Sequence, residues 1–154
     1  TIVKQFHDYD LLAIVKSPYL RAVEMWIDAQ SKLRKAEVGR LTLGNYYENL
    51  LNKWKHAPDD RINKQVDYLR SVNGEYFGTE VDFEVKNLFK YELLVDGDML
   101  ELNTFLEESH SSPLSYYHDP SLLKGWEDHY NDHAIEMVNY IFDEDFDFCG
   151  YFKL

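Results

Sequence analysis

Hydrophobic residues recur at three- and four-residue steps along much of the chain, which is the spacing of one face of an α-helix. This pattern predicts long helices over residues 17–37, 42–56, 58–74 and 120–142. Each has an apolar stripe that would face a core. The stripes are Leu20, Val23, Trp26, Ile27 and Leu33; Tyr46, Tyr47, Leu50, Leu51 and Trp54; Ile62, Val66, Leu69 and Val72; and Leu122, Leu123, Trp126, Tyr130, Ala134, Met137, Val138 and Ile141.

Start and stop signals support these boundaries. Ser17 precedes Pro18, and proline suits the first helical position because its missing N–H would be unpaired there anyway. Thr42 or Asn45 opens the next helix. Gly74 stands where a left-handed residue is expected to end a helix. Thr79 with Asp82 resembles a capping box, with Asp in place of the usual Glu.

The stretch 81–108 supports two interpretations. As helices, it breaks at Asp96-Gly97-Asp98 between two apolar stripes. As strands, Asp96-Gly97 is the turn of a hairpin that joins 91–95 to 99–103. Leu, Glu and Lys dominate and β-branched residues are scarce, so helices are favoured.

Beyond residue 142 the helical pattern stops. Phe142, Phe146 and Phe148 occupy even positions among acidic residues, and this period-two alternation predicts an extended segment with its aromatic side chains inward. Residues 109–121 contain two prolines and form the one long predicted loop, which also carries Tyr116 and Tyr117.

Together these elements predict a mainly helical, all-α single domain over residues 1–154, with about six or seven helices. The alternative is an α+β fold with a small hairpin in 88–103. A chain of this length can bury a core. The one cysteine, Cys149, cannot form an intramolecular disulfide, and no apolar run reaches the roughly 18 residues of a membrane span. We therefore expect a cytoplasmic protein.

The net charge of −12 is unevenly distributed. Residues 1–80 contain 12 Lys and Arg against 11 Asp and Glu, whereas residues 81–154 contain 4 against 17. An acidic surface repels nucleic acids and membranes, which are anionic, and steers basic proteins toward itself. The alternative is that the charge serves only solubility.

The segment Asp143–Asp147 has four carboxylates in five residues. Charges so close repel one another, and basic side chains of a partner would relieve that repulsion. Aromatic residues often dominate the energetics of interfaces. The predicted partner-binding residues are Asp143, Glu144, Asp145, Asp147, Phe146, Tyr116, Tyr117, Asp128 and Asp132.

Candidate catalytic and metal-binding residues are few. On a helix, His129, His133 and Glu136 would share one face and could hold zinc, but Tyr130 stands where the zinc-protease helix motif has glutamate. Cys149 lies among carboxylates, which raise the pKa of a thiol and reduce its reactivity. No nucleotide-binding or nucleophile motif occurs. We predict no catalytic residues, no metal and no cofactor.

The C-terminal quarter resembles the same region of helical immunity proteins, which protect bacteria from their own polymorphic nuclease toxins. A Trp126-containing helix followed by an aromatic block that ends in Cys-Gly-Tyr-Phe carries this resemblance. It implies an antitoxin that has no catalytic activity and binds its toxin in the cytoplasm.

The leading hypothesis is therefore an immunity protein that binds a basic toxin, a nuclease, without contacting nucleic acid or membrane itself. A second hypothesis is a phage-encoded inhibitor that mimics nucleic acid and blocks a defence nuclease. A third is a metal-dependent enzyme that uses the two histidines and Glu136.

Overall fold

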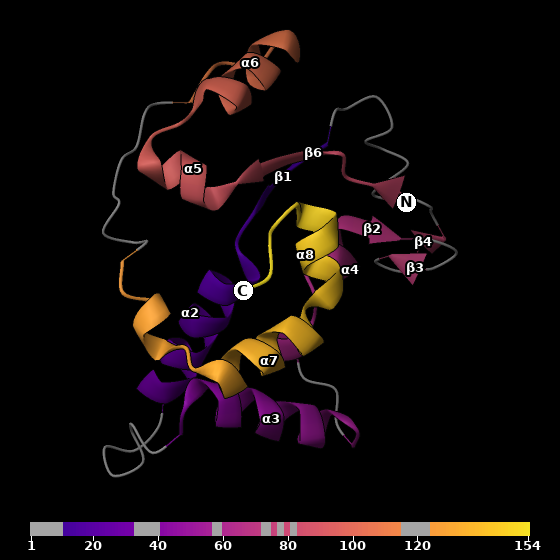
Figure 1. Ribbon diagram of the computed structural model, residues 1–154. Helices are drawn as coiled ribbons and strands as arrows, with labels where there is room; N and C mark the ends of the chain where they lie inside the picture. Colours follow the sequence, from indigo (N-terminus) through magenta and orange to yellow (C-terminus); the bar gives the residue numbers. More distant parts are fainter. Residues whose placement is uncertain are drawn as a thin grey trace. The chain divides into compact units, whose positions relative to one another are not determined.

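The computed structural model shows a mainly helical chain with three small two-stranded sheets (Figure 1). It describes residues 11–32, 41–56, 60–71, 75–76, 79–80, 83–114 and 124–154. The chain divides into two compact units, one of residues 1–15 and 65–122 and the other of residues 16–64 and 123–154. We call them the mixed unit and the helical unit. The prediction of one domain over residues 1–154 stays a prediction.

The helical unit contains four α-helices and two short 3₁₀ helices among its described residues. Its α7 lies along α3, and α2 packs against both (Figure 1). The elements are α2 (Pro18–Ser31), α3 (Leu43–Trp54), η1 (Asp60–Ile62), η3 (Glu127–His129), α7 (Asp132–Ile141) and α8 (Asp143–Cys149).

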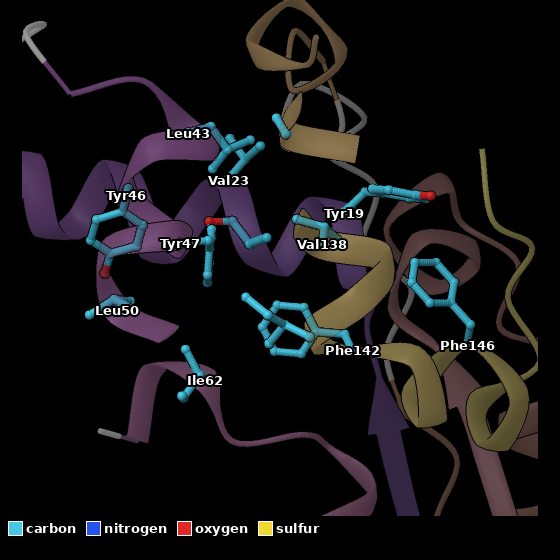
Figure 2. Packing of buried hydrophobic residues seen from close by; sticks show 13 residues of the cluster. Tyr19, Val23, Leu43, Tyr46, Tyr47, Leu50, Ile62, Val138, Phe142 and Phe146 are labelled. Carbon is cyan, nitrogen blue, oxygen red and sulfur yellow. The ribbon is translucent and has the colours of Figure 1, made fainter. Parts of the chain in front are cut away.

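The core of this unit is rich in aromatic side chains (Figure 2). The ring of Tyr47 meets that of Phe142 edge-on, with their centroids 5.7 Å apart. Burial raises the pKa of Tyr47, so its hydroxyl stays protonated and donates a hydrogen bond to the Ala22 carbonyl at 3.2 Å. The other large side chains of the core are Tyr19, Val23, Leu43, Tyr46, Leu50, Ile62, Val138, Ile141 and Phe146.

A glycine allows α3 and α7 to approach closely. A Cβ atom on Gly44 would lie 2.5 Å from Cδ2 of His133 and 3.2 Å from the backbone nitrogen of Ala134. Glycine costs a helix roughly 1 kcal/mol relative to alanine. Here that cost is offset because the two backbones can pack without an intervening side chain.

The described part of the mixed unit contains short strands and three short helices, two of which follow the last strand. Strand β1 pairs in parallel with β6, with Leu12 opposite Asn87 and Val15 opposite Lys90. The β2–β5 and β3–β4 pairs are antiparallel. The elements are β1 (Leu12–Val15), α4 (Val66–Leu69), β2 (Arg70–Ser71), β3 (Glu75–Tyr76), β4 (Thr79–Glu80), β5 (Phe83–Glu84), β6 (Asn87–Lys90), α5 (Tyr91–Asp96) and α6 (Leu100–Glu108).

Several predictions about helices are confirmed. Pro18 opens α2, and Thr42 caps α3 by accepting a hydrogen bond from the backbone N–H of Asn45 at 3.3 Å. Helices α5 and α6 occupy most of 91–108, so the alternative hairpin in 88–103 is wrong. The three small sheets nevertheless agree with an α+β fold more than with the predicted all-α fold, although the chain is mainly helical. Gly97 has a φ of 96°, a left-handed conformation that suits glycine and ends α5.

Other predicted helices are shorter than their apolar stripes indicated. The helix over 58–74 is wrong, because η1, α4 and β2 occupy its described part. The helix over 120–142 begins at Asp132, where Asn131 caps it by accepting a hydrogen bond from the N–H of Ala134. Residues 83–90 contain strands β5 and β6 instead of a helix.

Two smaller predictions are also wrong, and two others concern residues that the structure does not describe. Ile27 and Trp54, placed on buried stripes, are about half exposed. Thr79 lies in strand β4 and does not begin a helix. The predicted helix end near residue 37 and the tyrosines Tyr116 and Tyr117 fall outside the described residues.

The extended segment predicted after residue 142 is helix α8. Phe142, Phe146 and Cys149 are spaced by four and three residues, so on a helix they share one buried face. Carboxylates in the first turn favour a helix because its N-terminus carries partial positive charge. Gly150, with a φ of 69°, ends the helix. The spacing of Phe142 and Phe146 fits both periods, which explains the error.

No helix among the described residues is long and apolar enough to cross a membrane.

We expect the Phe142→Ala substitution to lower the free energy of unfolding by about 3–5 kcal/mol, because it leaves a cavity in the core. Phe142 is fully buried, whereas Phe152 is 94% exposed. The matched Phe152→Ala variant should change stability by no more than about 0.5 kcal/mol. Urea unfolding of both variants measures this difference, and equal effects would contradict the described core.

Candidate protein-binding site

The four carboxylates of α8 lie in different environments. Asp145 is completely buried, and its Oδ2 atom lies 3.8 Å from Nη1 of Arg21 on α2. The same guanidinium lies 5.3 Å from the centre of the Phe142 ring and donates a hydrogen bond to the Asn63 carbonyl at 2.8 Å. Asp145 therefore belongs to the interior, and the prediction that it contacts a partner is wrong.

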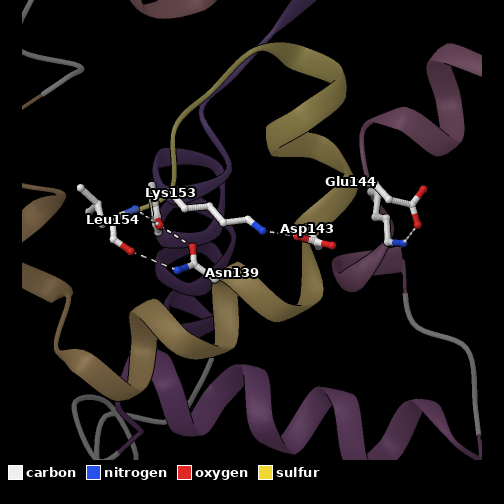
Figure 3. Close-up of polar contacts among 7 residues, drawn as sticks. Asn139, Asp143, Glu144, Lys153 and Leu154 are labelled. Atoms are coloured by element: carbon white, nitrogen blue, oxygen red, sulfur yellow. Dashed lines mark hydrogen bonds and ion pairs between the residues drawn. The ribbon is translucent and has the colours of Figure 1, made fainter.

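Two other carboxylates of α8 are exposed but form ion pairs (Figure 3). Asp143 pairs with Lys153, and this hydrogen bond, more than the charge itself, holds the pKa of Asp143 below its ordinary value. Glu144 lies 2.5 Å from Nζ of Lys64. These pairs neutralise part of the charge that the sequence places at 143–147.

The last residues fold back against α7 (Figure 3). The Leu154 backbone N–H donates to the Tyr19 hydroxyl at 2.7 Å, and Nδ2 of Asn139 donates to the Leu154 carbonyl at 3.2 Å. The Tyr19 hydroxyl in turn donates to Oδ1 of Asn139. This closed set of hydrogen bonds fixes Leu154 beside the outer face of α7.

The aromatic residues predicted to contact a partner do not form an exposed group in the described structure. Phe146 is buried in the core, so it cannot anchor a partner as predicted. Tyr116 and Tyr117 lie outside the described residues. The exposed aromatic side chain next to the acidic residues is Tyr140, which is 69% exposed.

The outer face of α7 is the strongest candidate for a binding surface. Asp132, Glu136 and Tyr140 recur at four-residue steps and so share one side of the helix, and Asp143, the first residue of α8, lies near them. They line a surface hollow of about 780 Å³, together with Leu154 and two other α7 side chains. The hollow therefore combines carboxylates, one aromatic ring and an apolar wall.

Several carboxylates around this face are not neutralised. Within the part of the chain that the structure describes, Asp128, Asp132 and Glu136 form no ion pair. Asp147 is exposed on the next helix. Of the predicted partner-binding residues, Asp128, Asp132 and Asp147 are thus available to a partner, and Asp143 is exposed but paired.

Sequence reasoning missed Tyr140 and Glu136 as members of this surface. The signal was present, because they lie opposite the apolar stripe of Ala134, Val138 and Ile141. The charge at 143–147 is denser, but the spacing of the exposed residues on α7 is more regular.

The histidine–glutamate trio does not form a metal site. His129 lies in η3, before α7 begins, and its ring packs 5.1 Å from that of Trp26. Nε2 of His133 lies 3.5 Å from a carboxylate oxygen of Glu48. No group of three metal-ligating side chains occurs among the described residues. The hypothesis of a metal-dependent enzyme loses its proposed ligands.

We expect Asp145→Asn to destabilise the protein by about 3 kcal/mol, because it leaves the Arg21 charge without its buried partner. Asp147→Asn, two residues along the same helix, removes an exposed carboxylate and should cost no more than about 0.5 kcal/mol. Chemical unfolding at neutral pH compares the two. A small loss for Asp145→Asn would show that Arg21 is compensated by other groups.

We expect Lys153→Met to raise the pKa of Asp143 toward its ordinary value, because the hydrogen bond and charge that favour the carboxylate are removed. Lys153→Arg should keep the pKa low. In the unmodified protein the ion pair persists above the lowered pKa and is lost as the pH falls through it. Carboxyl-carbon NMR titration measures each value, and an unchanged pKa in Lys153→Met would contradict the pairing.

Comparison with known proteins adds no family assignment. No family model matches the chain, and no curated protein or solved structure matches it either. The resemblance to immunity proteins therefore stays a prediction, and the functional argument depends on the geometry of α7 and α8.

Proposed function

We propose that the chain is an immunity protein that binds and neutralises a basic toxin, a nuclease, in the cytoplasm. The observation that supports this proposal is a set of carboxylates, on the outer face of α7 and in η3 before it, that form no ion pair with any residue that the structure describes. Asp128, Asp132 and Glu136 belong to this set. We call them the acidic face.

The charge balance favours a basic partner. Residues 123–154 contain eight carboxylates and two lysines. Internal pairs account for Asp143, Glu144 and Asp145. The remaining carboxylates repel one another at close range, and a cationic surface would relieve that repulsion on binding. Complementary potentials also speed the encounter of two proteins.

The rigidity of α7 favours binding over mere hydration. Ala134, Val138 and Ile141, on the opposite side of the helix, are buried in the aromatic core. The acidic face therefore has a fixed spacing, and ordering its side chains on binding costs less entropy than ordering a disordered tail.

A nuclease suits this surface because sites that bind nucleic acid are cationic. Carboxylates on a helix can occupy such a site or cover its edge, so neutralisation requires no chemistry. The proposed surface differs from that predicted from sequence. It is centred on α7, because Asp145 and Phe146 are interior residues.

The test begins with capture of a partner from the native host on immobilised protein, followed by its identification and purification. We expect the Asp132→Asn/Glu136→Gln variant to associate with this partner about tenfold more slowly at low salt, since it has lost steering charges. Association should also depend less on salt. Biolayer interferometry measures the rates, and an assay of the partner's nuclease activity measures neutralisation.

The matched control is Glu101→Gln/Glu108→Gln, which removes the same number of exposed charges from α6 in the mixed unit. It should leave association nearly unchanged. Equal slowing in the two variants would indicate a general charge effect and contradict the acidic face. A captured defence nuclease that releases this protein when DNA is added would instead support the nucleic-acid mimic.

A further inference from the structure

One aromatic side chain that lines the hollow on α7 lies mostly outside the buried core. Tyr140 is 69% exposed. It follows Glu136 by one turn of α7, and Asp143, the first residue of α8, lines the same hollow, so carboxylates from both helices lie near its ring. An exposed aromatic ring near negative charges offers a π-face where a cation would already be attracted.

Part of the lining of the hollow is apolar, and the backbone of one of its residues is held in place. Leu154 lines it and is held by hydrogen bonds of its backbone to Tyr19 and Asn139 (Figure 3). Ile135 adds a second apolar side chain. A guest that fits must therefore present methylene groups to one wall and positive charge to the carboxylates.

The two available carboxylates are one helical turn apart. Asp132 and Glu136 both line the hollow, and neither forms an ion pair within the described ranges. Asp143 lines it too, but Lys153 already neutralises its charge. A single incoming cation would therefore pair with Asp132 and Glu136.

We propose that this hollow receives an arginine side chain of the partner protein, an inference that rests on the proposed function. The guanidinium stacks on the ring of Tyr140 and pairs with Asp132 and Glu136. Its methylene stem packs on Ile135 and Leu154. Arginine fits better than lysine because its flat, weakly hydrated guanidinium stacks on rings and presents several N–H donors in a plane.

The test uses oligo-arginine and oligo-lysine peptides of equal length as probes, so it does not depend on the natural partner. We expect the arginine peptide to bind roughly fivefold more tightly, which corresponds to a cation–π contribution of about 1 kcal/mol. Isothermal titration calorimetry measures the affinities. Amide chemical shifts should change most over residues 132–143.

Two substitutions of the same residue separate stacking from charge. Tyr140→Ala should abolish the preference for arginine, whereas Tyr140→Phe should retain it because the ring remains. Tyr68→Ala, which removes another exposed tyrosine in the mixed unit, should leave the preference unchanged. Both residues are surface positions, so all three variants are expected to fold.

The outcomes distinguish this inference from the proposed function. Equal affinity for the two peptides, or a preference that survives Tyr140→Ala, overturns the arginine site. If the arginine site is overturned in this way but both peptides bind Asp132→Asn/Glu136→Gln more weakly than the unmodified protein, the acidic face is still supported. Shift changes spread over acidic residues of both units would also overturn the site, since they would show general attraction of cations.

Discussion

The burial of Phe142 and Phe146 against α2 and α3 is the constraint on which the helical unit depends (Figure 2). Phe142 ends α7 and directly precedes α8, so one buried ring fixes the junction of the two helices. A helix has one rotation that buries a given stripe. Once Val138 and Phe142 face the core, Asp132, Glu136 and Tyr140 must face outward. The candidate site is thus a consequence of packing.

Much of this arrangement could be predicted from sequence because it is local. The stripe on α7, the Thr42 cap and the end of α5 at Gly97 each depend on residues a few positions apart. The strands were missed because their pairing is not local. Strand β1 meets β6 across more than 70 residues, and four-residue strands have too little sequence pattern to predict that partner.

The acidic residues at 143–147 show why a high density of charge in the sequence does not by itself identify a binding site. The partners of Asp145, Asp143 and Glu144 are Arg21, Lys153 and Lys64, and two of these pairs join residues at least 80 positions apart. Only the folded chain shows which carboxylates are already paired. Within 143–147, the buried Asp145 contributes to stability, whereas Asp143, Glu144 and Asp147 contribute to surface charge.

A charge that forms an ion pair is explained by its contribution to the fold, whereas an unpaired charge on a marginally stable protein needs another explanation. Three of the four carboxylates of α8 form ion pairs with cations of the same unit, so their presence is explained by the fold. Asp132 is favoured at the N-terminus of α7, but it repels Glu136 across one turn, and in the described part of the chain neither carboxylate forms an ion pair. Features that disfavour the isolated fold tend to gather where function requires them. An exposed tyrosine beside them adds apolar surface that the core does not use. The two together favour α7, more than the denser cluster of α8, as the surface that meets a partner.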